Sequence, residues 1–262
     1  MEKTQPDNAA DAGRRLRLSK LLGAVGIVLM LLMYLLGPAF PYRSTPGYET
    51  EINNSYRPFS FFDLPKNEQG KPREFSLTAF LSGYHSMPAW RVSLEAPQYP
   101  KATFPDGIPV YFNLTRFTGE VQEMNTINHY IGMEPMEVGA PWERRLVPLI
   151  VLVFLVSLVV FLFYNGPGWW ILGIAPGLMP VYFVSVFSYW LYWFGHNLHS
   201  WGAFTIKPFM PTVLGDGKVA QFTTHSYPSI GFYVLVAVMI VMLLAVFIKR
   251  RALKELRAGP AK

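Results

Sequence analysis

Residues 230–248 read IGFYVLVAVMIVMLLAVFI, a run without a charged side chain, and three basic residues follow it directly. A helix of about 20 apolar residues is long enough to cross the hydrocarbon core of a bilayer, which is roughly 30 Å thick. Three further runs of this kind occupy residues 21–40, 146–164 and 169–194. The sequence therefore predicts an α-helical membrane protein with four transmembrane helices in a lipid bilayer.

Basic side chains are concentrated at the two ends of the chain. Residues 1–20 and 249–262 together hold eleven Lys and Arg against four Asp and Glu, whereas the rest of the chain holds 12 basic and 13 acidic residues. Basic flanks mark the cytoplasmic side of a membrane protein, so we expect both tails in the cytoplasm, beneath a bacterial inner (plasma) membrane. The net charge of +6 is then a topology signal and does not predict nucleic-acid binding.

The first apolar run, 21–40, could be mistaken for the core of a cleaved signal peptide, because basic residues precede it. The run is too long for that role, and no small-x-small cleavage motif is evident before Pro41. We therefore expect a retained signal-anchor helix. The polar residues 1–13 ahead of it are expected to be unstructured.

The topology leaves two long polar segments outside the membrane, in the periplasm. Residues 41–145 are numerous enough for a domain, and turn residues separate its short strand-like stretches. We therefore expect an inserted, exported β-rich domain, arranged as a small β-sandwich, with a short helix within 118–133. The segment 195–229 is too short to fold alone and is expected to pack on this domain or on a partner. The expected strands are 73–80, 90–94 and 110–117.

The two central apolar runs are expected to form a helical hairpin. Residues 165–168 between them read NGPG, which predicts a tight turn at the cytoplasmic face. Pro176 and Pro180 predict a kink in the second helix of the hairpin.

The apolar runs contain no Asp, Glu, Lys, Arg or His. Ion-coupled transporters and intramembrane haem sites depend on such groups, so the sequence argues against both. The chain has no cysteine, which excludes disulfides, thiolate metal sites and covalent haem attachment. Neither a Walker motif nor a Gly-x-Ser-x-Gly motif is present. We therefore assign no catalytic residue and favour a non-catalytic accessory subunit over an enzyme.

Every histidine lies outside the apolar runs, and the predicted topology places all five on the periplasmic side together with five methionines. Imidazole and thioether groups together are typical ligands of copper. We therefore hypothesise a copper site in the periplasmic part of the chain. The residues concerned are His85, His129, His196, His199 and His225, with Met87, Met124, Met133, Met136 and Met210.

Three spacings among these residues suit a shared metal ion. His85 and Met87 would project from one face of a strand. His129 and Met133 would share one face of a helix as an i, i+4 pair, with Met136 completing the set. His196 and His199 have the i, i+3 spacing of two ligands at a helix end. The alternative for each pair is a surface histidine beside a core methionine, since methionine fills irregular gaps well; His225 is isolated in sequence and fits a hydrogen-bonded loop residue.

Four glutamates surround the expected short helix, and their spacing is not specific to acid–base catalysis. A solvated anionic rim is the simpler interpretation, and such a rim would attract a cationic partner such as a basic cytochrome. The residues are Glu120, Glu123, Glu134 and Glu137.

Three segments carry a resemblance to a known family: residues 128–133 (NHYIGM), 207–212 (KPFMPT) and 217–228 (GKVAQFTTHSYP). They are similar to the small membrane protein encoded in atypical (clade II) nitrous oxide reductase gene clusters, which also has four spans and an exported domain after the first. The matching motifs cover about a third of the chain. The resemblance implies a non-catalytic membrane component of periplasmic nitrous oxide respiration, assisting electron delivery to the copper enzyme or its maturation.

Two other functions fit the same residues. The chain could be a catalytic subunit of a membrane copper monooxygenase, although such enzymes usually also place ligands within the membrane. It could also be a structural subunit of a respiratory or photosynthetic complex, with histidines that bind no metal. In each case the expected partners are a membrane complex and a periplasmic copper enzyme or cytochrome.

Overall fold

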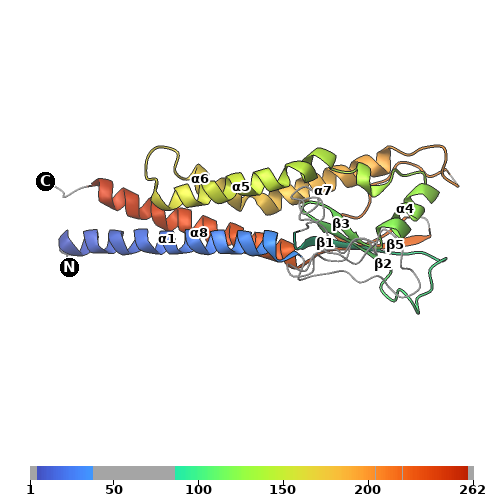
Figure 1. Ribbon diagram of the computed structural model, residues 1–262, viewed down its shortest axis with the longest axis horizontal. Coiled ribbons are helices and arrows are strands. Elements are labelled where there is room, and N and C mark those ends of the chain that lie inside the picture. Colours follow the sequence, from blue (N-terminus) through green and yellow to red (C-terminus); the bar gives the residue numbers. More distant parts are fainter. Residues whose placement is uncertain (1–4, 38–85, 204, 220, 259–262) are drawn as a thin grey trace, which may run out of the picture. The chain divides into compact units, whose positions relative to one another are not determined.

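The computed structural model describes residues 5–37, 86–203, 205–219 and 221–258 (Figure 1). They divide into two compact units. A helical unit contains most of α1, α5 and α8, all of α6 and the start of α7; the other unit contains a β-sheet, α4, η2 and the adjoining helix ends. In chain order the elements are α1 (Gln5–Leu35), β1 (Pro88–Glu95), β2 (Ile108–Asn113), β3 (Phe117–Gly119), α4 (Val121–Tyr130), η2 (Met136–Val138), α5 (Pro141–Phe163), α6 (Ile171–Gly177), α7 (Met179–His196), β4 (Gly215–Val219), β5 (Phe222–Pro228) and α8 (Ile230–Ala258).

Three helices are long and apolar enough to cross a membrane, namely α1, α5 and α8. Helices α6 and α7 are separated by a short break with a bend of 43°. They supply a fourth span if the bent pair is counted as one. The break falls at Leu178, between Pro176 and Pro180, where the proline rings remove backbone donors and obstruct regular helix geometry. The kink expected from these prolines is confirmed.

Two helices are longer than their apolar runs. Helix α1 begins at Gln5, so the expectation that residues 1–13 are unstructured is wrong from position 5 onward. Helix α8 continues to Ala258, well beyond the end of its apolar run at Ile248. Alanine, leucine, lysine and arginine favour helix, and they continue both helices beyond the apolar segments.

Glycines bring the helices of the helical unit close together. A Cβ atom added to Gly23 would lie 2.6 Å from Leu162 Cδ2 of α5, and one added to Gly26 would lie 2.7 Å from Met242 Sδ of α8. A Cβ on Gly173 of α6 would lie 2.8 Å from the Val246 side chain. Small residues at helix contacts allow the backbones to approach and gain dispersion energy, which is the main attraction between helices in a bilayer.

A buried lysine closes one end of helix α5. Lys249 of α8 is fully buried, and its Nζ donates hydrogen bonds to the Phe161 carbonyl and, at 2.9 Å, to the Tyr164 carbonyl. The ammonium also lies 4.4 Å from the Phe161 ring centroid and 5.3 Å from that of Trp169. The last carbonyls of a helix lack backbone partners and carry the negative end of its dipole, so this lysine satisfies them.

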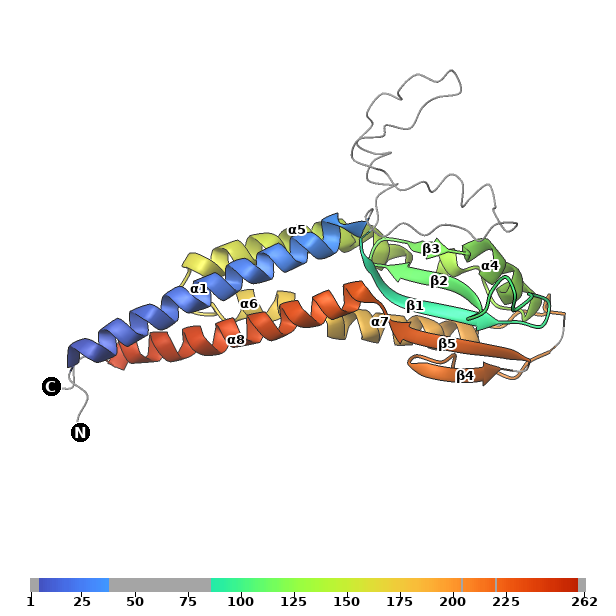
Figure 2. The same ribbon diagram turned by 90° about the horizontal axis from the view of Figure 1, so that it is seen from below.

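The second unit is built on a five-stranded antiparallel sheet with the order β3-β2-β1-β5-β4 (Figure 2). Three strands come from the first long polar segment and two from 195–229, which confirms that the second segment packs on the first. The expected strand 110–117 is interrupted, because Asn113 N donates to Arg116 O in a turn between β2 and β3. The described residues form one sheet and not both layers of the expected sandwich; the expected strand 73–80 lies outside them.

The sheet and α4 enclose a hydrophobic core. Ile108, Ile127 and Phe222, from β2, α4 and β5, are almost completely buried in one cluster. Near the other end of β1, the Trp90 indole donates to Ser226 Oγ at 2.8 Å and contacts the Phe232 ring edge to face. The short helix expected within 118–133 is confirmed as α4, which contributes Ile127 to this core.

Replacing Lys249 by alanine should lower the stability of the helical unit by about 2 kcal/mol, because two carbonyls would lose a charged donor. The measurement is thermal unfolding of the purified protein in detergent. Arg250→Ala is the matched control, since Arg250 is exposed. Its loss should change the free energy of unfolding by less than about 0.5 kcal/mol. Equal midpoints for the two variants would show that the lysine contacts do not stabilise the fold.

Candidate functional site

The strongest expected copper-ligand pair is not assembled as the spacing suggested. Helix α4 ends at Tyr130 and Gly132 adopts a φ of +79°, so His129 and Met133 do not share a helix face, and that expectation is wrong. Met133 is buried in the cluster around Phe222. Met136 is buried in a different cluster, with Val110 and Met124, whereas His129 is exposed.

The other expected ligands also have separate surroundings. Met87 is buried immediately before β1, and His85 lies outside the described residues. His196 ends α7 and stacks on Tyr192 at 3.9 Å, whereas His199 has other partners. Among the described residues, no group of three or more His, Asp and Glu side chains is placed to hold a metal ion. Copper binding through the expected His and Met side chains stays a prediction.

The structure brings His129 and His199 together on one indole, which we call the Trp201 stack. The ring centroids of His199 and Trp201 are 3.8 Å apart and their planes differ by 11°. His129 lies 6.0 Å from Trp201, with its plane turned by 15°. His199 Nε2 is 2.8 Å from Glu134 Oε1, which fixes the imidazole orientation. Sequence reasoning did not single out Trp201, because an indole is not a metal ligand.

Backbone contacts hold the Trp201 stack against the end of α4. His199 N donates to Gly132 O at 2.8 Å, and Ala203 N donates to Tyr130 O at 2.9 Å. A Cβ atom at residue 132 would lie 2.5 Å from His199 O. Gly132 therefore serves two needs, a positive φ that other residues rarely adopt and a close approach of the two segments.

Three of the four glutamates expected in a solvated anionic rim are exposed or partly exposed, namely Glu123, Glu134 and Glu137. Glu120 is buried, and Glu123 accepts a hydrogen bond from the Tyr99 hydroxyl. Glu134 is paired with His199, and Glu137 Oε2 accepts from Asn125 Nδ2 at 2.8 Å. Hydrogen bonds from the neutral donors Tyr99 and Asn125 do not cancel a carboxylate charge, so attraction of a cationic partner to this edge stays a prediction.

His225 belongs to a polar network across three strands. Its Nδ1 is 2.7 Å from Asp216 Oδ1 on β4, and its Nε2 is 3.5 Å from Glu95 Oε1 on β1. The Tyr227 hydroxyl donates to Asp216 Oδ1 at 2.9 Å, and Lys101 Nζ is 3.3 Å from Glu95 Oε2. His225 is hydrogen-bonded as expected, but its placement in a loop is wrong, since it lies within β5. Cross-strand neighbours of this kind appear only when the strand register is known.

The network changes the acidity of its members. The hydrogen bond and charge of Lys101, with a smaller contribution from His225, hold the pKa of Glu95 below its ordinary value. Hydrogen bonds from His225 and Tyr227 lower the pKa of Asp216. Donation to Asp216 raises the pKa of the Tyr227 hydroxyl, because the ionised carboxylate favours the protonated phenol.

A cavity of about 320 Å³ opens beside Glu95. Its floor is apolar, with Phe104 and Ile108 buried beneath it, and Lys101 and Tyr99 stand at its sides. The size is at the lower end of the range for small-molecule sites. Its charged side chains are paired with each other, and nothing in their arrangement resembles a nucleophile with its base.

No protein-family model, curated protein or solved structure matches this chain. Geometry alone therefore connects the three segments that carry the resemblance. Met133 of the first and Phe222 of the third are buried in one cluster, and Phe209 of the second packs against it. The three segments thus each contribute to one hydrophobic cluster, and Leu198, next to His199, packs on the same cluster.

The network predicts a loss of stability in acid. Because the folded-state pKa of Glu95 and Asp216 lies below the ordinary value near 4, their ionised forms favour the folded state at neutral pH. That contribution disappears as the pH falls through the lowered pKa values. We expect the unfolding temperature of the protein to fall more steeply between pH 5 and pH 3 than that of Asp216→Asn. Asp106→Asn, a change at an exposed loop carboxylate, is the control and should keep the steep profile; a flat wild-type profile would contradict the expectation.

Gly132→Ala should destabilise the protein by about 2 kcal/mol more than Gly215→Ala. Both positions have positive φ, which costs a non-glycine residue roughly 1–2 kcal/mol. Only Gly132 would also press a Cβ against a backbone carbonyl, since nothing lies within 4 Å of the Gly215 site. Chemical unfolding in detergent compares the two. Equal losses of stability in the two variants would mean that the His199 segment moves away from the added Cβ atom at no cost in free energy.

Proposed function

We propose that this protein is a membrane-anchored, non-catalytic accessory component of nitrous oxide respiration. Its β-sheet unit would face the periplasm and dock nitrous oxide reductase or the electron carrier that serves this copper enzyme. The observation that carries the proposal is the convergence of residues 128–133, 207–212 and 217–228 on one core. A resemblance scattered over unrelated surfaces would have little meaning, whereas one that maps to a single folded core supports shared structure.

The Trp201 stack is the surface that suits docking. Trp201 is 46% exposed and its neighbour Tyr130 is 42% exposed, although both carry large apolar rings. Tryptophan and tyrosine dominate the binding energy of protein interfaces, because they bury much area with few rotatable bonds. The hydrogen bonds from His199 and Ala203 to the end of α4 hold the indole in place before a partner arrives, which lowers the entropic cost of binding.

Docking does not require copper in this protein. Met133 and Met136, two of the expected thioether donors, lie in separate core clusters, so a role in positioning the enzyme or its electron donor is better supported than copper storage. A structural subunit of another respiratory or photosynthetic complex would also show exposed aromatic side chains. The two functions differ in the lifetime of the complex with the partner. A structural subunit stays bound through purification, whereas a docking component dissociates.

The docking role predicts that Trp201→Ala weakens binding to nitrous oxide reductase at least tenfold, since truncation of an interface tryptophan typically costs about 2 kcal/mol or more. Binding is measured with the purified full-length protein in detergent and the purified reductase on a biosensor. Trp142→Ala is the matched control, because Trp142 is 68% exposed and lies at the start of α5, away from the stack in sequence and contacts. It should leave binding unchanged.

Deletion of the gene should slow nitrous oxide consumption by cells that carry the reductase, and wild-type protein should restore it. Trp201→Ala should restore less than Trp142→Ala. Unchanged consumption after deletion would refute the respiratory assignment. Equal binding by both tryptophan variants would refute the assigned surface.

A further inference from the structure

The terminal parts of α1 and α8 form a packed pair of helices beyond the apolar runs. Sixteen residues of α1 precede Leu21 and ten residues of α8 follow Ile248, which correspond to about 24 Å and 15 Å of helix. Ala12 and Ser19 of α1 and Ala252 and Leu253 of α8 are buried. The basic residues from Arg14 to Lys20 and from Lys249 to Arg257 are therefore carried on packed helices.

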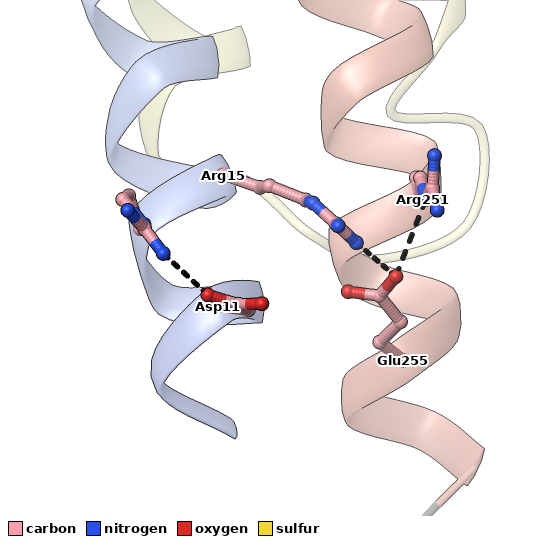
Figure 3. Close-up of polar contacts among 5 residues, drawn as sticks. Asp11, Arg15, Arg251 and Glu255 are labelled. Carbon is pink, nitrogen blue, oxygen red and sulfur yellow. Dashed lines mark hydrogen bonds and ion pairs between the residues drawn. The ribbon is translucent and has the colours of Figure 1, made fainter. Parts of the chain in front are cut away.

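An ion-pair cluster joins the two helices. Figure 3 shows Arg15 of α1 reaching across to Glu255 of α8, which also lies 3.4 Å from Arg251 Nε of its own helix. Asp11 pairs with Arg14 at 2.5 Å within α1. Asp11 and Glu255 are thus already paired with arginines.

Two cations of the pair without an ion pair have other partners, since Arg257 donates to the Asn165 carbonyl and Lys20 lies over the Phe163 ring; three further cations have no such contact among the described residues. Arg17, Arg250 and Lys254 are exposed, and no acidic side chain among the described residues forms an ion pair with them. Exposed leucines lie on the same helices, with Leu18 beside Arg17 and Leu256 two residues after Lys254. Basic side chains beside apolar ones suit a helix end at the edge of a bilayer, where the charged groups reach the polar layer.

We propose that this basic helix pair binds the phosphate headgroups of anionic phospholipids through Arg17, Arg250 and Lys254. The inference rests on the membrane placement given under Proposed function, and not on the respiratory partner. From the ends of the apolar runs, Arg250 lies about 3 Å away along the helix, Arg17 about 6 Å and Lys254 about 9 Å. A headgroup layer is roughly 5–8 Å thick, so the first two cations reach the phosphates directly, and Lys254 lies within about one Debye length of them.

The depth of these cations favours lipid over a soluble polyanion. A nucleic acid or an acidic protein would need its charges to approach within a few ångströms of the bilayer, where lipid phosphates already compete. The Arg15–Glu255 contact orders both helices, so the cations are held at a fixed depth. Each cation near an anionic surface strengthens lipid association by roughly fivefold.

The test uses the full-length protein in mixed detergent micelles that contain phosphatidylglycerol or phosphatidylcholine, with retained lipids counted by native mass spectrometry. Wild type should retain phosphatidylglycerol in strong preference. Arg17→Gln/Arg250→Gln/Lys254→Gln should reduce that preference on the order of a hundredfold. Asp11→Asn/Arg14→Gln removes a paired arginine together with its acid and should keep the preference. If the triple variant does not fold, Arg250→Gln/Lys254→Gln takes its place, with a reduction of about twentyfold expected.

Each remaining outcome counts against the inference. Equal retention of both lipids by wild type would overturn it while leaving the membrane placement intact, and retention of neither lipid would overturn both. An undiminished preference in the triple variant would show that other residues recognise the headgroup. Displacement of the bound lipid by soluble glycerol phosphate or by an RNA oligonucleotide at equal concentration would show that the surface recognises anions in general and not a membrane.

Discussion

The antiparallel pairing of β1 with β5 is the constraint on which the second unit depends, because it joins two polar segments that apolar helices separate in the sequence. Side chains alternate between the two faces of a strand, so Phe222 and His225, three residues apart, point to opposite faces. The register sets Ser93 opposite His225 and Asp216 opposite His225 on its other side. A slip of one residue would expose Phe222 and bury the imidazole, so the core and the polar network are fixed by the same ladder.

Gly132 links the hydrophobic core to the Trp201 stack through the backbone. The core residues Ile131 and Met133 flank it, and its positive φ turns the chain out of α4. Its carbonyl then receives the His199 amide, which places the imidazole on the indole. The position of one exposed aromatic surface therefore follows from a buried cluster and one backbone conformation, and a docking partner would meet a surface that is already ordered.

The sequence predicts the parts of this protein that depend on local chemistry. Apolar run length identified the long helices, Pro176 and Pro180 identified the bend, and β1 and α4 followed from composition. The sequence does not show what depends on register or on chain reversal. The stretch 110–117 is uniformly strand-like, yet a turn divides it, and the His129–Met133 spacing suggested a helix face that Gly132 removes. Trp201 and the partners of His225 become evident only after distant segments pair.

Methionine is the residue on which the sequence was most ambiguous, because a thioether suits both a core and a soft metal. Met87, Met124, Met133 and Met136 are all buried, and burial of a methionine side chain stabilises the folded state by roughly 1.5–3 kcal/mol. Bringing the Met133 and Met136 sulfurs to one copper ion would forfeit that contribution at two sites and open cavities in two clusters. Meanwhile His199 and His225 already face carboxylates, and His129 faces an indole. Four of the five methionines that suggested a soft metal site thus serve as buried apolar side chains in the fold.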